Sequence, residues 1–221
     1  MFKKLLHLSL TFSLAISVAL ISGCNASVTS TPNSMRGILR PQSSASREDI
    51  LADAIIIRER LVKFGLPYAS VFVNEDDEGS HIVIETPKMD DIDVIIELIT
   101  NVGTLSFTDT SGTVYLTNSD VKKASAGYDD NGAPVIILEL TPNGTSNFSL
   151  ATEQLTGRTM YIMIDGNIVS APVVNEKIIT SSLYVTGLEE YEHAKALAIV
   201  INSTLLHVNY DVYGFIDLTE E

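Results

Sequence analysis

Residues 162–173 read Ile162-Met163-Ile164-Asp165-Gly166-Asn167-Ile168-Val169-Ser170-Ala171-Pro172-Val173. Two apolar runs thus flank Asp165-Gly166-Asn167, and these three residue types favour tight turns because they tolerate positive φ or bond to their own backbone. The pattern predicts a β-hairpin with strands over 158–164 and 168–174. A hairpin is stable only when it joins a sheet or packs on a helix, so the residues around it decide the fold.

Short strands and helices alternate on both sides of this hairpin. Before it, the sequence predicts a short helix over 118–126, a strand over 134–140 and a helix over 142–155. After it, we expect a strand over 183–186, a helix over 189–203 and a last strand over 206–215. No internal repeat stands out.

An amphipathic helix is predicted from Arg47, where apolar residues begin to recur at steps of three and four, and Gly65 and Pro67 end it. The elements that follow are strands over 68–73 and 81–85, a helix over 90–102, and strands over 105–108 and 113–116. Residues 35–39 add a short strand before the first helix. This order is most of a ferredoxin-like βαββαβ unit, in which two helices cover one face of an antiparallel sheet. The predicted fold class is therefore α+β.

A series of motifs runs through the second half of the chain: Gly132-Ala133-Pro134-Val135, then Phe148 and Thr152, then Gly157-Arg158, then the Asp165-Gly166 hairpin that ends in Ser170-Ala171-Pro172. Together they resemble the head of the large periplasmic domain of SecD, a membrane subunit of the SecDF complex of protein export. Residues 57–65, 82–87 and 105–107 are similar to the base of the same domain. The resemblance spans about residues 49–210.

The resemblance implies a ferredoxin-like base, residues 47–117 plus 205–218, into which an α+β head, residues 118–204, is inserted. Two places depart from the family: Thr180-Ser181 stand where it has a Gly-Gly pair, and Asn202-Ser203-Thr204 where it has Arg-Ser-Gly. The family's proton-coupling carboxylates lie on membrane-spanning helices. No apolar segment after residue 24 is long enough to span a membrane. The resemblance therefore does not extend to proton-driven work.

Residues 1–23 are typical of a secretory signal, with Lys3 and Lys4 before a long apolar run. A transmembrane helix is the rival interpretation, because the run approaches the length of about 17–20 residues that a span needs. Ile21-Ser22-Gly23-Cys24 resembles the bacterial lipobox, which implies cleavage before Cys24 and lipid attached to it; a plain cleavable signal with an incidental thiol is the alternative. Residues 24–46, rich in Ser, Thr, Pro and Asn, are predicted to form a flexible tether. The expected location is the bacterial cell membrane, facing outside the cytoplasm.

Acidic residues outnumber basic ones by 28 to 14 in the 221-residue chain, a formal net charge of −14 that becomes −16 without Lys3 and Lys4. Such a surface repels the phosphates of nucleic acids, so no nucleic-acid partner is expected. The single cysteine excludes a disulfide framework and a cysteine-based zinc site. With 45% hydrophobic residues, the chain is too apolar for a disordered acidic tail.

No set of residues carries the signature of catalysis or of a bound cofactor. His81, His193 and His207 are not at metal-ligand spacing from one another. Residues 75–78 do not follow the spacing of an EF-hand, and Ser170 is not part of a G-x-S-x-G elbow. We therefore predict no catalytic residue, no cofactor, no metal site and no enzymatic activity.

We interpret the chain as a lipid-anchored, non-catalytic SecD-like protein that binds unfolded or translocating polypeptide and assists protein export. The alternative is an envelope interaction or assembly protein that uses the same fold for a dedicated partner; a small-molecule sensor has no polar constellation in its support. The head faces the substrate in the resembled family, so we predict partner contact at its tip, at Asp165, Gly166, Asn167 and, in the loop over 178–183, Ile179. The acidic surface favours basic or basic-flanked partners.

Overall fold

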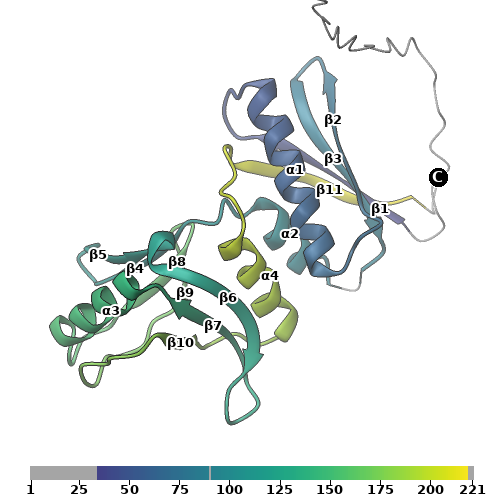
Figure 1. Ribbon diagram of the computed structural model, residues 1–221. Coiled ribbons are helices and arrows are strands. Elements are labelled where there is room, and N and C mark those ends of the chain that lie inside the picture. The colour runs from purple at the N-terminus through teal and green to yellow at the C-terminus, as the bar shows by residue number, and fades with distance from the viewer. Residues whose placement is uncertain (1–33, 90, 219–221) are drawn as a thin grey trace, which may run out of the picture.

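The computed structural model of the chain describes residues 34–89 and 91–218. The predicted signal, the lipobox with Cys24 and residues 24–33 of the predicted tether lie outside these residues. The flexible tether predicted over residues 24–46 is wrong for residues 34–41, which form a strand paired on both sides. Within them, none of the helices combines the length and the apolar character that a membrane crossing needs. The described chain forms two lobes, which we call the base and the head, and they are joined side by side (Figure 1).

The base is a four-stranded antiparallel sheet covered on one face by two helices. Its elements are β1 (Ser34–Pro41), α1 (Arg47–Phe64), β2 (Ser70–Asp76), β3 (Gly79–Pro87), α2 (Ile92–Thr100) and, from the other end of the chain, β11 (Tyr210–Asp217). The strand order is β11-β1-β3-β2, and every pair in it is antiparallel. This is the order of a βαββαβ unit whose fourth strand is β11, so the predicted ferredoxin-like base and the return of the last strand to its sheet are confirmed.

The first helix of the base has the ends that its sequence predicts. The Ser46 side chain accepts a hydrogen bond from the backbone N–H of Asp49, and Gly65 ends the helix in the left-handed region at φ 113°. Ile50, Ile57 and Leu61 on its inner face are buried against the sheet. Burying each of these side chains stabilises the base by about 1.5–3 kcal/mol.

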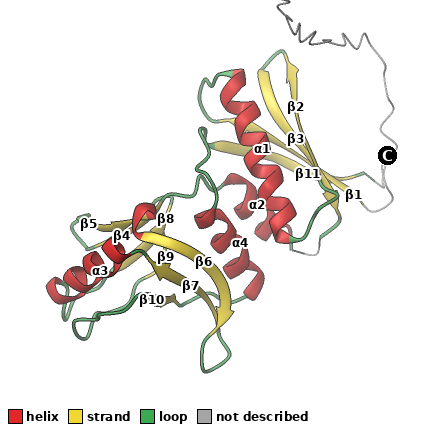
Figure 2. Ribbon diagram, viewed as in Figure 1, coloured by secondary structure: helices red, strands yellow, loops and turns green. Residues whose placement is uncertain are grey.

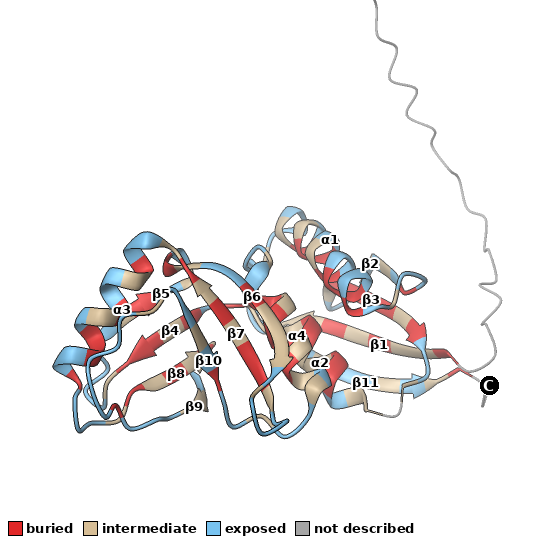
Figure 3. Ribbon diagram, turned by 60° about the horizontal axis from the view of Figure 1, so that its bottom comes forward, coloured by how far each residue is buried: buried red, intermediate tan, exposed pale blue. Residues whose placement is uncertain are grey.

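The head contains two small sheets and a helix. One sheet has the order β5-β4-β8-β9 and the other the order β10-β7-β6. The elements are β4 (Leu105–Thr108), β5 (Val114–Thr117), the 3-10 turn η1 (Asn118–Asp120), β6 (Val121–Tyr128), β7 (Pro134–Leu140), α3 (Pro142–Gln154), β8 (Tyr161–Ile164), β9 (Asn167–Ser170) and β10 (Ser182–Val185). Figure 3 shows the buried residues concentrated on the central strands, while much of α3 faces solvent.

Helix α4 (Tyr191–Asn202) lies between the two lobes and belongs to both cores (Figure 2). Ala194, Leu197, Ala198 and Ile201 pack into the core of the head, whereas Ala196 and Val200 pack into the core of the base. The Asn202 amide also holds β6, since it accepts from the backbone N–H of Ala124 and donates to its carbonyl. The two lobes therefore share a buried helix.

The helix predicted over 118–126 is wrong. Only η1 is helical there, and the rest of the segment is β6, which pairs with β7 along its length. The Asp129 carboxylate organises the connecting turn by accepting from the backbone N–H groups of Asn131 and Ala133. Pairing with the long apolar strand β7 outweighs the weak local preference of 118–126 for a helix.

The strands β4 and β5, expected in the base, belong instead to a sheet of the head. Strand β4 pairs with β8 of the Asp165 hairpin, and Leu105, Phe107 and Leu116 are buried in the core of the head. Locally the two strands follow α2 in the order that a βαββαβ unit requires. The place for a fourth base strand is filled by β11, however, and the chain leaves the base directly after α2.

Candidate functional site

An apolar groove of about 530 Å³ opens on the head between α3, β8 and β10. Its floor and walls include Phe107 from β4, Phe148 and Thr152 from α3, and Ile162 from β8. The remaining wall is the long connection from β9 to β10, which contributes Pro172, Val173, Val174, Asn175, Glu176, Ile178 and Thr180. A mostly apolar depression of this size fits a small set of side chains from a partner.

Hydrogen bonds hold this connection against α3 and so keep the groove open. The buried Thr152 hydroxyl donates to the carbonyl of Phe148, 2.9 Å away, and accepts from the backbone N–H of Ile178, also at 2.9 Å. Lys177 forms an ion pair with Glu153 at 2.8 Å on the surface above. Phe107 and Phe148 meet edge to face with 6.4 Å between ring centroids. Packing and hydrogen bonds within the chain thus form the groove without a bound partner.

Exposed apolar side chains surround the groove. Val173 is 58% exposed and Ile179 is 76% exposed, and Ile178 and Tyr184 are exposed beside them. Strand β10 lies at the end of its sheet, paired with β7 on one side and with no strand of the described residues on the other. Exposed apolar groups next to a free strand edge are typical of surfaces that bind extended peptides.

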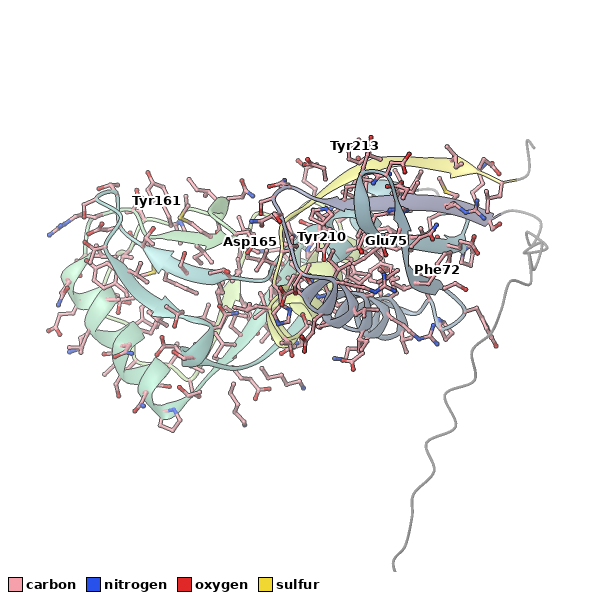
Figure 4. All side chains as sticks on the ribbon, turned by 90° about the horizontal axis from the view of Figure 1, so that it is seen from above. Phe72, Glu75, Tyr161, Asp165, Tyr210 and Tyr213 are labelled. Carbon is pink, nitrogen blue, oxygen red and sulfur yellow. The ribbon has the colours of Figure 1, made fainter. Side chains whose placement is uncertain are left out.

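The structure separates the residues that we predicted to contact a partner. The Asp165 carboxylate accepts hydrogen bonds from the backbone N–H groups of Gly103 and Thr104, and the Asp165 N–H donates to the carbonyl of Thr104. Asp165 therefore ties the hairpin to the connection between α2 and β4, on the base side of the head, while Tyr161 at the other end of β8 lies at the outer end (Figure 4). The turn of Asp165, Gly166 and Asn167 does not form the tip of the head. Ile179 follows the groove wall at Ile178, so of the four residues it alone lies beside the groove.

Arg60, on α1, is completely buried and holds both connections between base and head. Its guanidinium donates to the carbonyls of Leu98, Asn101 and Val102 where the chain leaves the base. It donates to the Ser203 hydroxyl and the Thr204 carbonyl where the chain returns. Burial lowers the pKa of Arg60 to about 10, so the side chain is still charged at neutral pH.

Asp53, also buried on α1, binds the returning chain a few residues after the Arg60 contacts. Its carboxylate accepts from the backbone N–H groups of His207 and Val208, from the His207 ring at 2.7 Å and from the Tyr210 hydroxyl at 2.9 Å. The hydrogen bond to Asp53 raises the pKa of His207 above its usual 6.5, and burial followed by the Asp53 charge raises the pKa of Tyr210. The entry to β11 is therefore fixed to α1 by charge-assisted bonds.

Sequence analysis did not assign these two buried groups. Arg60 and Asp53 lie on the buried face of α1, and their partners lie between 38 and 157 residues away along the chain. A basic and an acidic residue on the apolar stripe of α1 are the signal that could have revealed them, because a charge on a buried face needs a partner.

Comparison with known proteins agrees with this architecture. Residues 103–208 match the family model described as the SecDF P1 head subdomain. The protein translocase subunit SecD of Dictyoglomus turgidum is 31% identical over 153 residues, which are 69% of this chain and 38% of that protein. SecD of Acidaminococcus fermentans is 30% identical over 172 residues, 78% of this chain and 40% of that protein. The chain thus spans about two fifths of the length of these curated relatives.

Solved structures show the same fold. A crystal structure of SecDF in a super-membrane-facing form covers 82% of this chain and 30% of its own, with a TM-score of 0.64 and 22% identity. A structure from work on SecDF as a membrane component that enhances protein export covers 83% of this chain and 100% of its own, with a TM-score of 0.60 and 21% identity. The folded part of this chain is therefore a SecD-like domain, in which residues 103–208 match the SecDF P1 head subdomain.

Proposed function

We propose that this chain is a lipid-anchored, non-catalytic domain that binds extended polypeptide in the groove of its head and so assists protein export. The observation that carries the proposal is the apolar groove with exposed Val173 and Ile179 at its margin and the free edge of β10 beside it. The similar proteins are named translocase subunits, and polypeptide in transit is extended, with exposed apolar side chains and unpaired backbone groups.

The groove and the strand edge suit different parts of such a ligand. Backbone N–H and C=O groups of an extended segment pair with the free edge of β10, and alternate side chains enter the apolar groove. Backbone pairing is the same for every sequence, so the binding is expected to be weak and poorly selective. The net negative charge favours segments with basic flanks, with an attraction that decays over a Debye length of about 8 Å at physiological salt.

Replacing Val173 or Ile179 by Asp should weaken capture of an unfolded polypeptide about tenfold, because a carboxylate must then be desolvated at the apolar margin of the groove. Both residues are more than half exposed, so the substitutions leave the fold intact. Binding is measured by fluorescence anisotropy with a labelled, reduced and unfolded secretory chain.

The matched control is Ile55→Asp on α1, since Ile55 is 63% exposed and lies in the base. If Val173→Asp and Ile179→Asp bind the unfolded chain as tightly as the parent protein, the groove is not the binding site. Salt should weaken the binding of a basic-flanked polypeptide more than that of a neutral one.

The Ile55→Asp variant also tests the alternative function, that of an envelope protein that binds one dedicated partner. Leu51, Ile55 and Val62 form an exposed apolar stripe on the outer face of α1. A shallow depression of about 360 Å³ lies there among Ile55, Arg58, Glu59, Val62 and Lys63. Loss of partner capture from cells by Ile55→Asp, with Val173→Asp unaffected, would favour docking of a folded partner on the base.

The proposed anchor depends on Cys24. Replacing Cys24 by Ser should leave the precursor uncleaved or release the protein from the membrane fraction, because the hydroxyl cannot form the thioether that carries the lipid. Two or more acyl chains give stable attachment at about 0.8 kcal/mol for each buried CH₂. The measurement is membrane fractionation with metabolic labelling by palmitate. A processed Cys24→Ser protein that stays with membranes would contradict the anchor.

A further inference from the structure

A histidine and carboxylates from two helices meet at the junction of base and head. Asp91 precedes α2, Glu190 precedes α4, and His193 lies in the first turn of α4. One potential ligand atom from each of the three residues lies within 4.8 Å of the other two. His193 Nε2 and Asp91 Oδ2 lie 3.7 Å apart. The imidazole nitrogen distinguishes this group from the many carboxylate pairs on an acidic surface.

Glu97, on α2, fixes the orientation of the imidazole. Its carboxylate lies 3.0 Å from His193 Nδ1, and its side chain is largely shielded from solvent. When Nδ1–H donates to Glu97, the neutral ring presents the lone pair of Nε2 toward Asp91. A carboxylate behind the ring and open ligands in front of it form the arrangement that orients histidine ligands in metal sites.

We propose that Asp91, Glu190 and His193 bind one divalent transition-metal ion, with Zn²⁺ as the best fit. Two ligand atoms bonded to one tetrahedral ion at about 2.1 Å are separated by roughly 3.4 Å, close to the 3.7 Å between His193 Nε2 and Asp91 Oδ2. Glu190 is exposed and its side chain makes no capping bond, so it is free to close the remaining distance. One imidazole with two carboxylates selects Zn²⁺ over Mg²⁺ and Ca²⁺, which prefer oxygen ligands alone.

A metal ion at this position would link the base to the helix that base and head share. Asp91 is attached to a helix of the base, whereas Glu190 and His193 belong to the helix that the two cores share. The ion would join α2 to α4 at their N-terminal ends, and Arg60 joins the connections that follow the C-terminal ends of the same helices. Metal binding therefore stiffens the junction between base and head.

The test is calorimetric titration of the tag-free protein with Zn²⁺ and, separately, with Mg²⁺. We expect one Zn²⁺ for each chain, no measurable Mg²⁺ at the same concentration, and a higher thermal midpoint with Zn²⁺. Glu190→Gln and His193→Gln should each weaken Zn²⁺ binding at least tenfold, and both should fold because neither residue is buried.

Glu189→Gln is the matched control, since it removes the same charge from the neighbouring exposed residue and should bind Zn²⁺ as the parent does. Absence of Zn²⁺ binding by the parent protein would overturn the proposal and leave His193 as a partner of two carboxylates. Binding that all three variants retain would also overturn it, because the ion would then bind at other residues.

Discussion

Replacing Arg60 by methionine will lower the free energy of unfolding by about 3–5 kcal/mol, the range for breaking a buried charged network from one side. Methionine fills a similar volume but donates no hydrogen bond. Five acceptors then lose their donor: the Ser203 hydroxyl and the carbonyls of Leu98, Asn101, Val102 and Thr204. Each buried acceptor left without a partner costs about 1–3 kcal/mol, and water that enters offsets part of the cost.

Chemical denaturation followed by circular dichroism measures this loss. Arg58→Met is the control, because Arg58 is exposed on the same helix and makes one hydrogen bond, to the carbonyl of Ala69. We expect it to cost less than about 1 kcal/mol. An Arg60→Met protein with the stability of Arg58→Met would mean that the two connections are held by packing alone.

Local patterns in the sequence predicted most of the elements. The 3.6-residue repeat of apolar residues located α1 to its ends, because the sequence there also contains the Ser46 and Gly65 caps. The Asp165-Gly166 turn located the β8–β9 hairpin, since Gly166 and Asp165 both adopt positive φ in it. These features depend on neighbouring residues only, and a single sequence records them directly.

Features that depend on distant residues were missed or misplaced. Strand β6 was wrongly predicted as a helix, because its strand conformation depends on pairing with β7, which the local sequence of β6 does not reveal. Asp91 and His193, whose side chains meet in the structure, are about a hundred residues apart in the sequence, so no spacing motif connects them. The hairpin turn at Asp165 was predicted to be an exposed tip, but its carboxylate binds the backbone at Gly103 and Thr104.

Pairing between distant strands also changes the predicted N-terminal limit of the head. The resemblance implied a head of residues 118–204, with β4 and β5 left in the base. In the structure the β4–β8 pairing closes one sheet of the head, and Leu105, Phe107 and Leu116 lie in its core with at most 1% of their surface exposed. We therefore propose that the smallest unit of the head that folds alone begins at residue 103.

A fragment of residues 103–204 should fold, and a fragment of residues 118–204 should not. The shorter one lacks three fully buried side chains, worth roughly 5–9 kcal/mol at about 1.5–3 kcal/mol each. That loss equals much of the 5–15 kcal/mol that stabilises a typical domain, and it also exposes the edge of β8. Proton–nitrogen NMR spectra of the two fragments decide the question by the dispersion of amide signals. A dispersed spectrum from residues 118–204 would show that the β4–β5 hairpin is dispensable, and a collapsed spectrum from residues 103–204 would show that the head needs the base, through the shared helix α4, to fold.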